Sequence, residues 1–209
     1  MKRRHQTGFG KLTISILTIM VATVCSVRGQ NQNDYKVYDA VIRHMFRDGI
    51  TQFDMNAKID KIVIRDRTFS EYSSHVEKEN WPQVKIRLRS LTDETVGGYA
   101  AARIKENEFK MKLDIPFKYI LLTNKQLDMV FPDRNYDGLT AYWSEFYRLY
   151  PGSGGYNSFS KVGYDKSGRF ALVYFVNRCG SHCGTGTYVL VEKSEGGWVV
   201  KETAMMWIS

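Results

Sequence analysis

Two cysteines and a histidine lie close together near the end of the chain, within residues 178–184 (RCGSHCG). In an oxidising compartment, two cysteines four positions apart at a hairpin tip are expected to form a disulfide. So short a bridge stiffens the tip and adds only about 2 kcal/mol to stability. Zinc or copper(I) binding by Cys179, His182 and Cys183 is an alternative without a fourth ligand. A redox role for the two cysteines is a second alternative, although their C-x3-C spacing differs from the C-x2-C of thioredoxin-like sites. The disulfide Cys179–Cys183 is the preferred prediction.

Residues 133–138 (DRNYDG) place oxygen-bearing side chains at alternate positions before a glycine. A calcium loop begins in this way, with Asp133, Asn135 and Asp137 as ligands and the glycine allowing a sharp turn. The match then ends, because Glu145 comes one residue too late to be the bidentate closing ligand. A polar turn between two helices is the alternative. We therefore expect no cofactor, with calcium as the secondary hypothesis.

Conventional enzyme signatures are missing from the sequence, which has no His-Glu-x-x-His, Gly-x-Ser-x-Gly, P-loop or dinucleotide-binding fingerprint. Beyond the N-terminal leader described below, its histidines are His44, His75 and His182. A small extracytoplasmic hydrolase that uses His182 or His75 with partners from distant segments is therefore an alternative. The balance favours a protein that is not an enzyme.

The elements that must position these groups differ along the chain. Residues 30–151 are expected to be helix-rich, and from residue 158 onward the pattern is one of strands and turns. Helices are predicted at 33–48, 92–104, 124–131 and 143–150, and short strands at 62–64, 84–88 and 119–122. A helix that carries aromatic residues at i, i+3, i+4 and i+7 ends at Pro151. These aromatics are more typical of a core stripe than of a sugar-binding platform.

Four strands with short connections are predicted over residues 158–209, at 159–164, 170–176, 187–193 and from Trp198 onward. Such an order is typical of an antiparallel meander that the preceding helices cover. The expected fold is therefore α+β, with helices and short strands packed on a four-stranded antiparallel meander. Three loops remain as candidate binding loops, at 133–138, at 152–156 with Gly152 and Tyr156, and at 179–184 with His182.

The N-terminus has the features of a secretory signal peptide. Three basic residues at 2–4 precede an apolar run of 14 residues, Leu12 to Cys25, which is short for a membrane span. Val27 and Gly29 are small enough for the −3 and −1 positions, so cleavage is expected after Gly29. A lipoprotein acylated at Cys25 and an uncleaved anchor are the alternatives.

Cleavage changes the charge of the chain. The leader carries five basic residues and no acidic ones, so the formal net charge falls from +8 to +3. The basic precursor is therefore poor evidence for nucleic-acid binding, and no nucleic acid is expected as a partner. No other apolar stretch is a candidate membrane span. The expected mature protein is a single domain, residues 30–209, that is secreted or periplasmic.

The second half of the chain also contains a series of short motifs. They are SKVGY at 160–164, ALVY at 171–174, CGSHCGTG at 179–186, YVLVEK at 188–193, GGWVV at 196–200 and MMWIS at 205–209. Together they resemble a group of uncharacterised secreted bacterial proteins. The resemblance implies an extracytoplasmic location and a similar fold, and it brings no catalytic residues.

These observations predict an exported, non-enzymatic binding or interaction module of the cell envelope or periplasm, with an envelope or extracellular ligand. The hydrolase is the first alternative. A structural protein stabilised by calcium or another metal is the second, and a chelator should lower its melting temperature.

Overall fold

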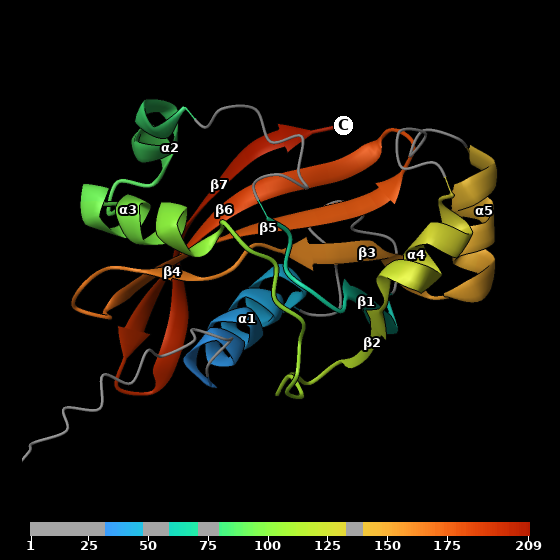
Figure 1. Ribbon diagram of the computed structural model, residues 1–209, viewed down its shortest axis with the longest axis horizontal. Helices are drawn as coiled ribbons and strands as arrows, with labels where there is room; N and C mark the ends of the chain where they lie inside the picture. Colours follow the sequence, from blue (N-terminus) through green and yellow to red (C-terminus); the bar gives the residue numbers. More distant parts are fainter. Residues whose placement is uncertain (1–31, 48–58, 71–79, 133–139) are drawn as a thin grey trace, which may run out of the picture.

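The computed structural model describes residues 32–47, 59–70, 80–132 and 140–209, and the predicted signal peptide at 1–29 lies outside them. The helices are α1 (Gln32–Met45), α2 (Trp81–Arg87), α3 (Asp93–Ala102), α4 (Asn124–Val130) and α5 (Thr140–Leu149). The strands are β1 (Lys61–Arg65), β2 (Lys118–Leu122), β3 (Ser153–Phe159), β4 (Gly163–Tyr164), β5 (Phe170–Gly180), β6 (Cys183–Ser194) and β7 (Gly197–Ile208). The α+β class is confirmed (Figure 1).

The strands of the described ranges form one seven-stranded mixed sheet in the order β2-β1-β3-β5-β6-β7, with β4 paired to β5 (Figure 1). β1 is parallel to both β2 and β3. From β3 through β5 and β6 to β7, each strand is antiparallel to the next. The predicted meander is therefore correct only in part. The antiparallel strands belong to a larger sheet, in which β3 also pairs with β1 in parallel.

The predicted strand at 159–164 is divided between the last residue of β3 and the two-residue strand β4. Ser160 lies at the division. Its hydroxyl, in place of a backbone carbonyl, accepts the N–H of Tyr174 at 2.8 Å. A side chain that takes over a backbone partner in this way competes with the regular ladder, and the strand is interrupted there.

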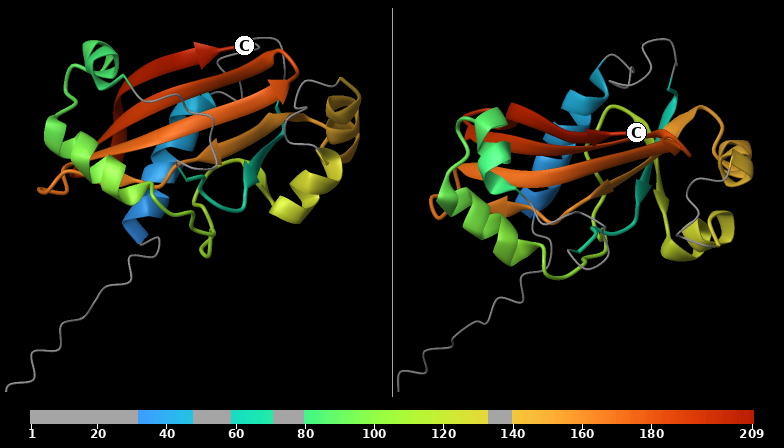
Figure 2. Two further views of the ribbon diagram at one scale, coloured as in Figure 1. Left: turned by 45° about the horizontal axis from the view of Figure 1, so that its top comes forward. Right: turned by 90° about the horizontal axis from the view of Figure 1, so that it is seen from above.

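α1 crosses one face of the sheet (Figure 2). The apolar residues at helical spacing along α1 are buried and include Tyr38, Val41, Ile42 and Met45. Two hydroxyls join the helix to the sheet: Tyr164 donates to the buried carboxylate of Asp34 at 2.7 Å, and Tyr38 donates to the carbonyl of Ser160 at 3.1 Å. Burial, together with the Asp34 carboxylate, raises the pKa of Tyr164. The phenol therefore remains a donor at any physiological pH.

The opposite face carries two pairs of helices, α2 with α3 at one end and α4 with α5 at the other (Figures 1 and 2). The first pair packs on β5, β6 and β7, and the second on β1, β2 and β3. The predicted aromatic stripe of α5 belongs to this second core, where Trp143 and Phe146 are buried. Trp143 stacks on Tyr156 of β3, with the ring planes 11° apart and the centroids 5.9 Å apart.

α2 replaces the strand that was predicted at 84–88 from alternating apolar and basic residues, and that prediction is wrong. Val84 and Leu88 are the buried residues of this segment. Their spacing fits one face of a helix as well as alternate positions of a strand. The side chain of Asn80 caps the helix by accepting the N–H three residues later. Two basic residues of the segment bind neighbouring elements: Lys85 pairs with an aspartate of α3, and Arg87 donates to a carbonyl of β7.

A close contact between α3 and β4 depends on Gly98. A β-carbon at Gly98 would overlap the carbonyl of Tyr164, whereas a β-carbon at Gly97 would meet nothing within 4 Å. Gly163 on β4 is equally close to α3, because a β-carbon at Gly163 would overlap the backbone of Tyr99. The paired glycines weaken the helix in isolation, but Gly98 allows the helix to lie directly against the strand.

Gly98→Ala and Gly97→Ala form a matched pair of substitutions on this helix. Gly97→Ala should raise the free energy of unfolding by about 0.5–1 kcal/mol, because it only improves helix propensity. Gly98→Ala should lower it by about 1–3 kcal/mol, because α3 has to move away from β4. Urea unfolding followed by circular dichroism measures both. Equal effects of the two substitutions would contradict the close contact.

Candidate functional site

A hairpin tip, defined here as residues 178–184, joins the end of β5 to the start of β6. Cys179 and Cys183 are joined by a disulfide with their Cα atoms 4.9 Å apart, so the predicted pair is confirmed. Ser181 and His182 form the turn, and His182 is exposed. Because the bridge closes a very short loop, it removes little entropy from the unfolded chain. Its main effect in the folded protein is to hold the tip in one shape.

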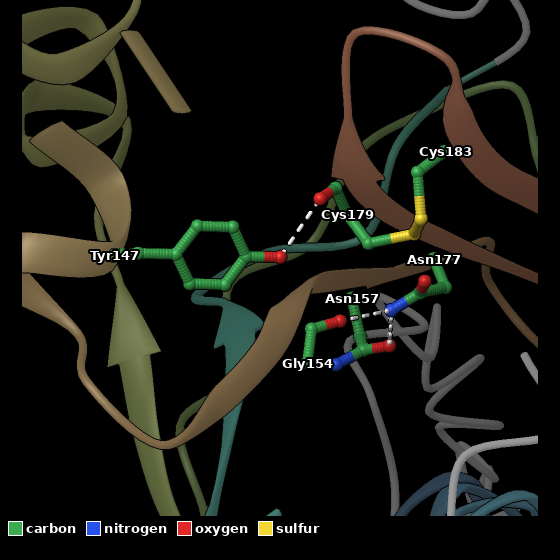
Figure 3. Close-up of a disulfide and its surroundings, with 6 residues drawn as sticks. All are labelled: Tyr147, Gly154, Asn157, Asn177, Cys179 and Cys183. Atoms are coloured by element: carbon green, nitrogen blue, oxygen red, sulfur yellow. Dashed lines mark hydrogen bonds between the residues drawn. A yellow bond between two sulfur atoms is a disulfide. The ribbon is translucent and has the colours of Figure 1, made fainter. Parts of the chain in front are cut away.

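Two buried asparagines connect the base of this tip to the neighbouring strands (Figure 3). Asn157 on β3 lies directly opposite Asn177 on β5, and each side chain is 2% exposed. Asn157 Nδ2 donates to the carbonyl of Val63 on β1 at 3.0 Å. Asn177 Nδ2 donates to Asn157 Oδ1 at 3.0 Å and to the carbonyl of Gly154 at 3.1 Å. The two amides therefore link β1, β3 and β5 at the level where the tip begins.

α5 supports the tip from the side. The hydroxyl of Tyr147 donates to the carbonyl of Cys179 at 2.8 Å (Figure 3). Burial raises the pKa of Tyr147, so the phenol keeps its proton and remains the donor. The stacking of Trp143 on Tyr156 fixes α5 on β3, so the helix and the tip are held in one frame.

The predicted binding loop at 152–156 is not a loop, and this prediction is wrong. Ser153 onward forms β3, which pairs with β1 on one side and with β5 on the other. Tyr156 is buried in the aromatic core, and Gly152 lies in the turn before the strand. Gly155 has a φ of +84° and packs against the backbone of Arg178 and Cys179, where a β-carbon would not fit. The segment therefore supports the tip and is not a separate binding loop.

The remaining predicted site residues are distributed as follows. Asp133, Asn135 and Asp137 lie outside the described residues, as does His75, so the calcium hypothesis stays a prediction. In the described ranges, no group of three or more histidine, cysteine or acidic side chains could hold a metal ion. His182 has no described hydrogen-bond or ionic partner. Among the predicted site residues that the structure describes, Cys179, Cys183 and His182 lie together in the hairpin tip.

A cluster that the sequence did not reveal joins α1 to the segment before β2. Asp39 accepts the backbone N–H of Asp114 at 3.1 Å, and Arg43 donates to the carbonyl of Asp114. Burial raises the pKa of Asp39 to about 6; the nearby Asp114 carboxylate also raises it, whereas the Asp114 N–H and Arg43 lower it. The cluster holds two chain segments together. Isolated aspartates 75 positions apart carry no spacing signal that could have revealed it.

Comparison of the chain with family models, with curated proteins and with solved structures finds no significant match. The helices in the described ranges include none that is both long and apolar enough to cross a membrane.

The hydrogen bond between α5 and the tip can be tested with Tyr147→Phe. Loss of the hydroxyl should lower the free energy of unfolding by about 1 kcal/mol, because the carbonyl of Cys179 loses a half-buried donor. Amide hydrogen exchange at 179–184 should become faster. Tyr142→Phe is the control, since this half-buried tyrosine is on the same helix and its hydroxyl has no partner in the described ranges. Indistinguishable results from the two variants would show that the bond does not hold the tip.

Proposed function

We propose that the mature chain, residues 30–209, is an exported, non-enzymatic binding module of the cell envelope or periplasm, and that the hairpin tip is its recognition element. The observation that carries the proposal is the support given to the tip. A disulfide and the Tyr147 hydroxyl hold its backbone, and the asparagine pair links the strands at its base. The turn residue His182 is exposed.

Support of this kind indicates that the rigid tip serves ligand binding more than the stability of the fold. The stable core lies in the three apolar clusters on the two faces of the sheet, and a bridge across so short a loop adds about 2 kcal/mol at most. A binding loop, by contrast, gains affinity when it is rigid beforehand, because less conformational entropy is lost on association. Exposed loops on a rigid scaffold are common binding elements.

The disulfide also supports the proposed compartment. Disulfide bonds persist in secreted and periplasmic proteins and are rare in proteins of reducing compartments. The predicted leader with cleavage after Gly29, and the resemblance to secreted bacterial proteins, support the same location. The hydrolase alternative stays a prediction: in the described ranges His182 has no hydrogen-bond or ionic partner, and His75 lies outside those ranges.

The charge of the tip favours an acidic ligand. From Arg178 to Val191 the chain has no acidic residue, and its basic residues are Arg178 and His182. Charge complementarity sets the orientation and the rate of association. Among envelope polymers, peptidoglycan presents carboxylates on its stem peptides, and it is insoluble, so it is a suitable probe.

Sedimentation of the mature protein with isolated peptidoglycan sacculi tests this proposal. His182→Glu should weaken binding at least fivefold, about 1 kcal/mol, because it places a negative charge on the turn. Lys166→Gln is the control, because it also lowers the charge by one at an exposed turn, next to the opposite end of β5. Equal retention of both variants, or no retention of the unmodified protein, would overturn the assignment of the tip as the binding element for an acidic envelope polymer.

A further inference from the structure

Four uncharged polar side chains are buried beside one another on the face of the sheet that α1 covers. They are Asn157, Asn177 and Thr187, each 2% exposed, and Thr185, which is 1% exposed. Thr185 is directly opposite Asn177, and Thr187 is two residues further along β6 on the same face. The neighbouring positions of this face, including Phe175 and Val189, are apolar.

The orientation of both amides follows from their acceptors. The carbonyl of Val63 requires an N–H, so Asn157 presents Nδ2 to it and Oδ1 towards Asn177. Asn177 must then present its Nδ2, and the carbonyl of Gly154 requires the same group. A flipped amide would place oxygen against oxygen at both contacts. Asn177 Oδ1 is therefore directed away from these partners.

Three buried oxygens are left without a hydrogen bond: Asn177 Oδ1, Thr185 Oγ1 and Thr187 Oγ1. None of the three bonds to another, although their residues are neighbours on adjacent strands. Buried polar atoms are rarely left unpaired, and ordered water commonly satisfies those that have no protein partner. Three such atoms together indicate a common bridging group.

We propose that one buried water molecule bridges Asn177 Oδ1, Thr185 Oγ1 and Thr187 Oγ1. The water donates one hydrogen to the amide oxygen and the other to one threonine hydroxyl, and it accepts the hydroxyl hydrogen of the second threonine. This gives three hydrogen bonds, the usual number for a buried water. A calcium or magnesium ion fits poorly, because these ions take six or more oxygen ligands and favour carboxylates. The site lies beneath the base of the hairpin tip and does not depend on the proposed function.

Thr185→Val and Thr187→Val test the bridge, because valine has the shape of threonine without the hydroxyl. With the water present, each substitution removes one of its three bonds and leaves the other two oxygens poorly satisfied. The melting temperature should then fall by about 2–4 °C. Without the water, valine removes an unpaired buried hydroxyl, and the melting temperature should rise.

Thr203→Val on β7 provides the baseline, because Thr203 is exposed and the same change there alters only strand propensity. Water–protein nuclear Overhauser effects at the methyl groups of Thr185 and Thr187 give an independent readout. A long-lived water signal, with both buried variants melting below Thr203→Val, supports the bridge. A melting temperature above this control for either buried variant, or no water signal, overturns it.

Discussion

Strand β3 has to pair with β1 in parallel and with β5 in antiparallel orientation, and the arrangement of the whole sheet depends on how it does both. The register between β1 and β3 shifts between Lys61 and Val63. Next to this shift, Asn157 supplies a side-chain donor to the carbonyl of Val63, and Asn177 closes the junction from β5. Because the same Asn177 precedes the cysteine bridge, the junction also fixes where the hairpin tip begins.

Much of the fold could be predicted from periodicity. The helical spacing of the apolar residues in α1 and α5 and the buried run of β5 are strong signals, and the structure confirms them. Two failures have physical causes. The buried pair Val84 and Leu88 has a spacing that fits a helix face as well as a strand. The cap at Asn80, with Pro82 in the first turn, favours the helix. The sequence of β3, SGGYNSF, has no apolar alternation, so its strand forms through pairing on both sides and not through local propensity.

The candidate site was predictable in its chemistry but not in its support. Two cysteines around a turn are visible in any reading of the sequence, and the structure joins them. Asn157 and Asn177 are separate polar residues without a spacing pattern, and only the sheet register places them opposite each other. The aromatic stripe that contains Tyr147 is predictable from its helical spacing, whereas the hydrogen bond from the Tyr147 hydroxyl to the tip depends on how α5 lies across β3.

We infer that the amides of Asn157 and Asn177 act as one unit that holds the tip. A double-mutant cycle with Asn157→Ala, Asn177→Ala and the pair measures this directly from the free energies of unfolding. We expect a coupling energy of about 1 kcal/mol or more, with faster amide exchange at 178–184 in each single variant. Additivity within about 0.5 kcal/mol, with unchanged exchange at the tip, would contradict the claim.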